Sequence, residues 1–353
     1  MILVIAGTRP ELIKLSPVVL ELRRRGIEHM FASTGQHSIA EPPWPGAAAP
    51  DTILAGPKQG TSLPGQFAHI FSALAAKMPC WKPSAVVVQG DTTSVLVGAQ
   101  AAFMAGVPVL HVEAGLRSGR LYDPYPEEAY RQLVSKLATV NCAPTLRAAR
   151  TLMHEKVPGR ITVTGNTVTD SLRLALPHAT WPIGLPGPEG KMILATCHRR
   201  ENWGKGAREL RSVLASLADE YQEPVTVYVV VHPNPLASAP FTEEAHPRII
   251  VVPPQPYPSM LALLQRANAI VTDSGGLMEE AVTLGRQVCI YRRTTERQEA
   301  VEAGAARLDE NLGNVYHILT AMLDGHHACR PCRGVFGDGH AAERIVDELM
   351  EWV

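Results

Sequence analysis

The chain has 353 residues, of which 46% are apolar and 19% are charged, and its formal net charge is −1. This length exceeds one ordinary hydrophobic core and predicts two domains. The near-neutral charge excludes a basic surface for nucleic acid or an anionic membrane, and no apolar run approaches the length of a membrane span.

Cysteine usage and the first residues indicate the compartment. The chain opens on a short apolar run without the positive charge of a signal peptide, and its six cysteines are scattered. We therefore expect a reduced, cytoplasmic protein. One segment has metal-like composition, with His326, His327, Cys329 and Cys332. It falls in a loop with Pro and Gly after a helix, so we expect no metal ion there.

Strands and helices alternate throughout the first half of the chain. The strands are continuous apolar runs, as in a parallel sheet that is covered on both faces. They are expected near residues 2–6, 28–34, 85–89, 108–112 and 139–143. Helices are expected near residues 11–25, 64–77, 93–105, 127–138 and 145–155. Residues 41–62 are rich in Pro, Gly and Ala without a clear period, and are interpreted as a loop.

A linker rich in Pro and Gly, residues 177–190, precedes a second series of strands. These are expected near residues 191–196, 225–231, 248–252, 268–272 and 287–291. The predicted fold class is therefore α/β, with two Rossmann-like doubly wound domains facing a central ligand cleft. We expect an N-terminal domain over 1–176 and a C-terminal domain over 177–339. The last helix, within 340–353, has no following strand and is free to pack back on the first domain.

The chain lacks a dinucleotide-binding fingerprint in its required context. A Gly-x-Gly-x-x-Ala pattern begins at Gly337, but it follows no expected strand and opens no βαβ unit. A P-loop pattern is also missing. A nucleotide is therefore expected to be a substrate, and we expect no cofactor.

Polar side chains follow the strands of the first domain, at the edge where the strand ends meet. Arg9 stands in a turn fixed by Gly and Pro after the first strand, and Lys14 follows on the first helix. Asp91 comes after a buried strand, where it is either a helix N-cap or a functional group. Glu113 ends another apolar strand, which is costly unless the carboxylate is paired or functional. We favour function for Glu113.

Two more segments carry groups suited to acid–base chemistry. Glu127 and Glu128 begin a helix behind a Pro-Tyr-Pro sequence, which predicts a shaped loop and one carboxylate that faces the substrate. In the second domain, His198 is followed by two arginines after the first strand. This pattern suits phosphate contact or proton transfer, and the alternative is an ordinary buried histidine.

A Thr-Asp-Ser-Gly-Gly sequence predicts a nucleotide pocket, because it joins a buried strand to a helix and contains Ser274, Gly275 and Gly276. Its small residues allow a ligand to approach the backbone, and a helix N-terminus favours a phosphate. Glu280 lies one helical turn later, where a carboxylate can accept hydrogen bonds from a ribose diol. Arg297 follows another strand and is suited to a second phosphate contact. Carboxylates beside a leaving diphosphate suit both oxocarbenium chemistry at a sugar and acid–base chemistry at carbon.

Taken in order, these motifs resemble those of the non-hydrolysing UDP-N-acetylglucosamine 2-epimerase family over nearly the whole chain. The resemblance implies the two-domain architecture of GT-B glycosyltransferases. It also implies reversible conversion of UDP-N-acetylglucosamine (UDP-GlcNAc) to UDP-N-acetylmannosamine (UDP-ManNAc) in a cytoplasmic homodimer, without an added redox cofactor. The motifs that carry it lie at residues 7–11, 90–93, 111–117, 126–128, 198–202, 272–276, 279–280 and 294–297.

The resemblance assigns roles to individual residues. Asp91, Glu113 and Glu127 resemble the catalytic carboxylates of the family, and His198 resembles its active-site histidine. The residues that resemble its UDP-binding set are Arg9, Ser274, Gly275, Gly276, Glu280 and Arg297. We add Lys14, on the first helix, to these candidates for UDP binding.

The chain departs from the family pattern at several positions. Gln89 stands where His is usual, Tyr130 where Asn is usual, and Met260 at an often aromatic position. After residue 37 the usual continuation is replaced by a shorter loop rich in Pro. In bacterial members that region helps to form a second, activating UDP-GlcNAc site. The residues that remain as candidates for a second site are Gln36, Gln59, Arg199 and His232.

Other functions would use the same nucleotide pocket. A hydrolysing epimerase would release UDP and free N-acetylmannosamine, and a GT-B glycosyltransferase would also need an acceptor groove. A non-catalytic nucleotide-sugar sensor would need the pocket around Ser274 but not three carboxylates, whose joint presence argues against it.

Overall fold

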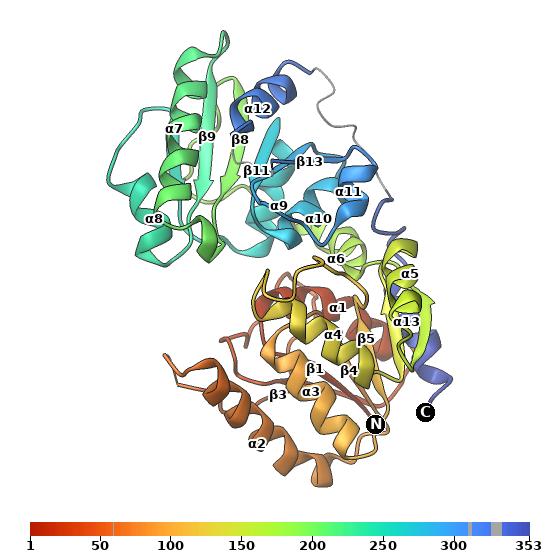
Figure 1. Cartoon of the computed structure of the whole chain (residues 1–353). Coiled ribbons are helices and arrows are strands. Elements are labelled where there is room, and N and C mark those ends of the chain that lie inside the picture. Colours follow the sequence, from red (N-terminus) through yellow and green to blue (C-terminus); the bar gives the residue numbers. More distant parts are fainter. Residues whose placement is uncertain (59, 310–312, 326–333) are drawn as a thin grey trace. The chain divides into compact units, whose positions relative to one another are not determined.

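The computed structural model describes residues 1–58, 60–309, 313–325 and 334–353. The chain forms two compact units. Unit 1 contains Met1–Pro177 and Phe336–Val353, and unit 2 contains His178–Val335 (Figure 1). Among the described residues, no helix is long and apolar enough to cross a membrane.

Unit 1 is built on a seven-stranded parallel sheet with the order β3-β2-β1-β4-β5-β6-β7. Its strands are β1 (Ile2–Ala6), β2 (His29–Ser33), β3 (Thr52–Ile53), β4 (Ala85–Gln89), β5 (Val109–Val112), β6 (Val140–Ala143) and β7 (Arg160–Val163). Its α-helices are α1 (Arg9–Arg24), α2 (Leu63–Trp81), α3 (Thr93–Met104), α4 (Glu127–Leu137), α5 (Leu146–His154), α6 (Thr167–Ala175) and α13 (Ala341–Met350).

Both faces of this sheet are covered, which explains why its central strands are apolar throughout. Along β1, Ile2 and Val4 pack against α1 and α13, whereas Leu3 and Ile5 pack against α2 and α3. All five residues of β1 are buried. Burying one such side chain contributes roughly 1.5–3 kcal/mol relative to leaving it exposed.

The C-terminal helix α13 belongs to unit 1, where it lies among elements from the start of the chain (Figure 1). Both carboxylate oxygens of Asp170, on α6, accept hydrogen bonds from its first turn: Ala341 N at 3.2 Å and Ala342 N at 3.0 Å. These are N–H groups that a helix start cannot satisfy by itself. Asp170 therefore fixes α13 onto α6.

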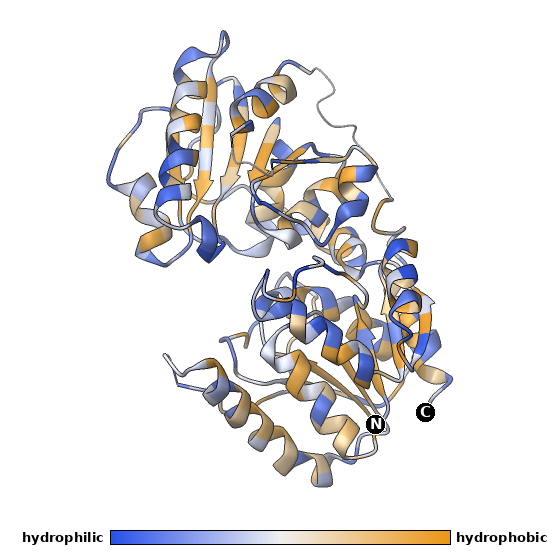
Figure 2. Cartoon of the chain, viewed as in Figure 1, coloured by the Kyte–Doolittle hydropathy of each residue, from blue (hydrophilic) through white to orange (hydrophobic). Residues whose placement is uncertain are grey.

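Unit 2 contains a six-stranded parallel sheet with the order β10-β9-β8-β11-β12-β13. Figure 2 shows its central strands as apolar and the flanking helices as mixed. The strands are β8 (Lys191–Thr196), β9 (Val225–Val230), β10 (Ile249–Val252), β11 (Ala269–Thr272), β12 (Val288–Ile290) and β13 (Ala306–Leu308). The α-helices are α7 (Lys205–Glu220), α8 (Pro235–Thr242), α9 (Tyr257–Arg266), α10 (Gly275–Thr283), α11 (Gln298–Glu302) and α12 (Val315–Leu323).

The expected class, with two doubly wound parallel sheets, is confirmed. The strands that sequence analysis missed, β3, β7 and β13, each lie at the edge of a sheet. The edge strand β3 has two residues and falls inside the predicted loop, and β7 has no buried residue. An edge strand packs on fewer neighbours, so it needs no continuous apolar run and gives no such signal.

Candidate functional site

In unit 1, the predicted groups Lys14 and Glu113 meet Gln89 at the carboxyl ends of β4 and β5. Lys14 forms an ion pair with Glu113, and Gln89 Nε2 donates to the same carboxylate at 2.8 Å. All three side chains are buried. Glu113 has a φ of 66°, in the left-handed region that a side chain disfavours. Such strain persists where the surroundings impose it, and it clusters at functional sites.

Asp91 lies at the neighbouring strand end and is paired through α4. Its Oδ2 is 2.5 Å from Arg131 Nη2, and Arg131 Nη1 lies 3.0 Å from Glu128 Oε2. Glu128 is fully buried and also accepts from Ser118 N at 3.0 Å. Glu128 thus shapes the loop before α4, whereas the partly exposed Glu127 has the better position to reach a ligand.

Glu11 is a buried carboxyl of this cluster that the sequence analysis did not assign to the site. Oε2 accepts from Gly7 N at 2.6 Å, and Oε1 accepts from Thr8 Oγ1 at 3.0 Å. Burial raises the pKa of Glu11 to about 7, with a smaller contribution from the Asp91 charge. A Glu in the first turn of a helix is ordinary for the helix dipole, so the sequence carried no signal for this role.

The remaining unit 1 candidates lie on the same edge. Arg9 is the exposed first residue of α1. The side-chain oxygen of Gln36 accepts from Ser94 N at 3.1 Å and from Ser94 Oγ at 2.6 Å, at the start of α3. Gln36 therefore caps a helix here, whatever ligand it contacts. Gln59 lies outside the described residues.

In unit 2, the predicted nucleotide residues form the turn between β11 and α10. Ser274 is the N-cap of α10, and its Oγ accepts from Leu277 N at 3.4 Å. A Cβ added to Gly275 would lie 2.5 Å from Arg297 Nη1, so the guanidinium occupies the space that a side chain would take. A Cβ added to Gly276 would meet no atom within 4 Å. A side chain at 275 would therefore displace the Arg297 guanidinium, whereas position 276 opens onto free space beside the helix start.

Arg297 is buried and held by two carboxylates. Its Nε donates to Glu279 Oε1 at 2.5 Å, and its Nη1 donates to Glu296. These bonds fix the guanidinium over the start of α10, where its charge adds to the positive end of the helix dipole. Glu280 is 9% exposed and lies one turn further on, beside Tyr257. Burial, and then the Glu280 charge, raise the pKa of Tyr257 well above its usual value.

His198 follows β8 and lies beside β9. Its Nε2 donates to the Val230 carbonyl at 3.1 Å, and its ring meets the His232 ring edge-on, with centroids 5.7 Å apart. Burial, and then the proximity of His198, lower the pKa of His232. Arg199 Nη2 lies 3.7 Å from Glu296 Oε1. The structure thus brings His198 and His232 together and relates Arg199 to the carboxylate that holds Arg297.

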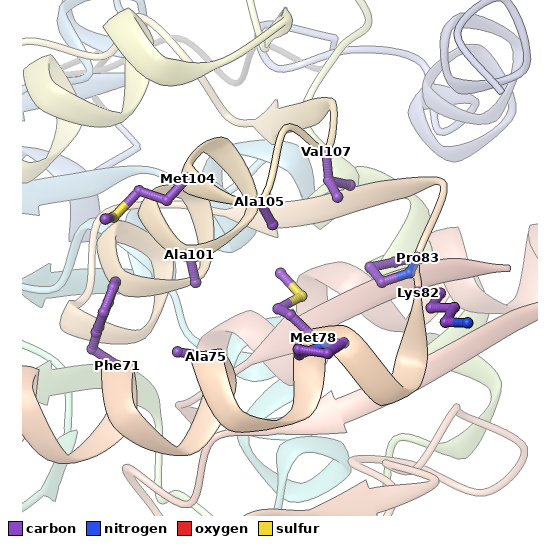
Figure 3. Close-up of a pocket in the computed structure, with 10 residues that line it drawn as sticks. Phe71, Ala75, Met78, Lys82, Pro83, Ala101, Met104, Ala105 and Val107 are labelled. Carbon is purple, nitrogen blue, oxygen red and sulfur yellow. The ribbon is translucent and has the colours of Figure 1, made fainter.

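A further concave feature carries none of these groups. A groove of about 550 Å³ lies between the ends of α2 and α3. Figure 3 shows Phe71, Ala75 and Met78 pointing toward Ala101 and Met104. The lining is apolar apart from Lys82 at one end. Its lining contains no carboxylate or histidine, so the polar strand ends remain the candidate site.

Among the residues that the structure describes, no group of three or more His, Cys, Asp or Glu side chains is placed to hold a metal ion. His326, His327, Cys329 and Cys332 lie outside the described residues.

Comparison with known proteins gives the family. The sequence pattern of the family described as UDP-N-acetylglucosamine 2-epimerase matches residues 20–350. The chain belongs to this family. The UDP-N-acetylglucosamine 2-epimerase of Yersinia pestis is 37% identical over 373 residues, which cover 99% of this chain and 98% of the relative.

Two solved epimerase structures with ligands resemble this fold closely. The Neisseria meningitidis UDP-GlcNAc 2-epimerase bound to UDP-GlcNAc has a TM-score of 0.89 and 33% identity, with 99% of each chain covered. The Staphylococcus aureus MnaA structure with UDP has a TM-score of 0.88 and 32% identity, and covers 99% of this chain and 96% of that chain.

The structure shows the contacts of two residues that depart from the epimerase family pattern. Gln89, where the family usually has His, donates to Glu113 and so keeps a donor beside that carboxylate. Tyr130, where Asn is usual, lies beside Thr93 and Glu127, and burial raises its pKa.

Proposed function

We propose that this protein interconverts UDP-GlcNAc and UDP-ManNAc by inverting C2, without net hydrolysis. The observation that carries the proposal is the carboxylate cluster at the ends of β4 and β5, where Asp91 pairs with Arg131 and the buried Glu113 is strained and bonded to Lys14 and Gln89. A protein that only bound the nucleotide would need the turn around Ser274 but not this cluster. Membership of the epimerase family supports the same reaction.

Unit 2 would hold the UDP moiety. The N-terminus of α10 presents backbone N–H groups, and the open space at Gly276 lets a phosphate approach them. Arg297, fixed by Glu279 and Glu296, would add positive charge as the diphosphate leaves. Glu280 would accept hydrogen bonds from the ribose hydroxyls. Arg9 and Lys14 of unit 1 are proposed as further contacts to the nucleotide.

The proposed reaction begins with departure of UDP, because the C2 proton of GlcNAc is not adjacent to a carbonyl and is not acidic by itself. The C1–oxygen bond breaks and its electron pair leaves with UDP. A carboxylate then removes the C2 proton from the oxocarbenium-like species, and the C2–H electrons form the C1–C2 double bond of 2-acetamidoglucal. Protonation of C2 on the opposite face and return of UDP to C1 give the epimer.

This scheme needs two proton-transfer groups on opposite faces of the sugar ring. Asp91, Glu113 and Glu127 are the proposed groups, and we assign no face to any of them. His198 is proposed to act near the diphosphate, where its ring is oriented by the Val230 carbonyl. General acid–base groups of this kind each contribute about 10²–10⁴ in rate.

A hydrolysing epimerase is the nearest alternative, because it shares the first half of the reaction. The two are separated by incubating the protein with UDP-GlcNAc alone and following the mixture by proton NMR. The proposal expects UDP-ManNAc in equilibrium with UDP-GlcNAc. If UDP and free N-acetylmannosamine form, the hydrolysing activity replaces the proposed one. If UDP-GlcNAc stays unchanged while the protein still binds UDP, the protein is a sensor or a glycosyltransferase that lacks its acceptor.

We further propose that the protein acts as a cytoplasmic homodimer. The cysteines in the described part of the chain, Cys80, Cys142, Cys197 and Cys289, form no disulfide bond, which fits a reducing compartment. Sedimentation equilibrium across a range of concentrations tests the assembly. A mass near 38.2 kDa at all micromolar concentrations would contradict the dimer.

A second, activating nucleotide site is the least supported family property in this chain, because the region after residue 37 is rebuilt. Gln36 already bonds Ser94, and Gln59 lies outside the described residues. Arg199 and His232 remain candidates. We propose that the reaction starts from UDP-ManNAc without added UDP-GlcNAc.

A further inference from the structure

Asp273, the residue before the Ser274 turn, is fully buried and joins that turn to the loop that carries His198. Its Oδ1 accepts from His198 N at 2.8 Å. Its Oδ2 accepts from Arg199 N at 2.9 Å and from Asn202 Nδ2 at 2.9 Å. One carboxylate therefore accepts two consecutive backbone N–H groups and a side-chain amide from the same loop.

The same network reaches a third strand end. Asn202 Nδ2 also donates to the Tyr291 carbonyl at 3.0 Å, directly after β12. Because β8, β11 and β12 are neighbours in the sheet, Asp273 and Asn202 tie three adjacent strand ends together. Trp203 Nε1 closes the loop by donating to the His198 carbonyl at 3.1 Å.

The chemistry of this contact favours a side chain with two acceptor oxygens. Every hydrogen bond described for Asp273 has an N–H donor, and a carboxylate is a pure acceptor that satisfies them all. An amide at the same place keeps one acceptor oxygen but turns an NH₂ group toward N–H donors. If the amide oxygen takes the place of Oδ2, it can still accept from His198 N, which also lies 3.0 Å from Oδ2. The NH₂ group then stands at the Oδ1 position, 2.8 Å from the same nitrogen. Two donors would oppose each other there, so the loop would have to move.

We infer that Asp273 is a positioning residue for the reaction, which holds His198 in a fixed place relative to the nucleotide turn at Ser274. This inference rests on the proposed role of His198. Asp273 itself has no open face toward a ligand, since it is fully buried. Its effect on catalysis therefore passes through the His198 loop, and displacement of a reacting group by about 1 Å can cost about 10²-fold in rate.

A matched control variant separates a positioning role of Asp273 from a general effect on the stability of unit 2. Asp309 is another buried carboxylate at a strand end of unit 2, and it accepts from Asn314 N at 2.7 Å. It has no described hydrogen bond to the His198 loop. Asp309→Asn thus reports what the loss of a buried acidic acceptor does to the stability of unit 2 in general.

The first test is a double-mutant cycle with Asp273→Asn and His198→Ala, using UDP-GlcNAc as substrate. Asp273→Asn should lower kcat by about 10–100-fold, and should change kcat by less than about 3-fold when His198 is already Ala. Asp309→Asn should leave kcat within about 3-fold. Equal losses from Asp273→Asn in both backgrounds, or an equal loss from Asp309→Asn, would overturn the inference.

A second measurement does not depend on turnover. With ¹⁵N-histidine labelling, the backbone amide resonance of His198 should shift and exchange faster in Asp273→Asn, and should be unchanged in Asp309→Asn. An unchanged His198 amide in folded Asp273→Asn would refute the positioning role even if the native protein proved inactive on UDP-GlcNAc, an outcome that would separately refute the proposed function.

If Asp273→Asn does not fold, Asn202→Ala removes one donor and keeps the Asp273 side chain. Asn202→Ala should lower kcat several-fold in the wild-type background and leave it unchanged in the His198→Ala background. An equal loss of kcat in the His198→Ala background would count against the inference.

Discussion

Replacing Glu11 by Gln should make unit 1 more stable at neutral pH, although it removes a charged residue from a hydrogen-bonded cluster. Burial raises the pKa of Glu11 from 4.5 to about 7. The folded state therefore favours the neutral carboxyl. Gln has the shape of that neutral form: its oxygen can accept from Gly7 N, and its NH₂ can donate to Thr8 Oγ1.

The size and direction of the effect follow from linkage. Because the folded-state pKa lies above the unfolded value, the native protein loses stability as pH rises from 4.5 to about 7, where the unfolded chain ionises more readily. A separation of about 2.5 pKa units, at about 1.36 kcal/mol each, corresponds to about 3 kcal/mol. At 2% exposure, solvent screens this carboxyl very little.

The assay must report on unit 1, because a protein with two units need not unfold in one step. Hydrogen exchange of slowly exchanging amides in β1 and β4 measures its opening free energy. Between pH 5 and pH 8, wild type should lose most of about 3 kcal/mol relative to Glu11→Gln. Parallel curves for the two proteins over this range would show that Glu11 has an ordinary pKa and refute the reasoning.

Three further predictions concern ligand binding and turnover. Glu280→Gln should weaken UDP binding by about 1.5–3 kcal/mol if the carboxylate makes charge-assisted bonds to the ribose, and an unchanged affinity by calorimetry in a folded variant would remove that assignment. Glu113→Gln and Asp91→Asn should each lower kcat by about 10²–10⁴ while UDP still binds; steady-state kinetics that show a change in KM alone would contradict a role in proton transfer. Starting from UDP-ManNAc, the reaction should proceed without a lag, and a long lag that traces of UDP-GlcNAc abolish would restore an activating second site.

The fold was predictable where burial is complete. The central strands β1, β4 and β8 are buried on both faces, so their sequences are unbroken apolar runs with clear ends. The edge strands β7 and β13 have little to bury and were missed. The apolar pattern of a segment reflects how much of it is buried in the core, so it indicates little about strands at the edge of a sheet.

The site was predictable in its residue types but not in its pairing. Glu113 after an apolar strand drew attention because an unpaired carboxylate there is costly, yet its partner Lys14 is 99 residues earlier in the chain. The bonds from Arg297 to Glu279 and Glu296 likewise depend on how α10 and the segment before α11 pack. Asp273 lies inside the Thr-Asp-Ser-Gly-Gly motif. Its hydrogen bonds with the His198 loop could not be predicted from that motif, because they depend on the pairing of β8 with β11.

The most direct test of the proposed function is to run the reaction in deuterium oxide and examine C2 of the product. If a carboxylate removes the C2 proton and a different group returns one on the opposite face, each molecule of UDP-ManNAc should carry deuterium at C2. Proton NMR should show loss of the product's C2 signal, with the other ring protons unchanged. UDP-ManNAc that forms rapidly and keeps its original C2 proton would contradict elimination and point to hydride or internal transfer.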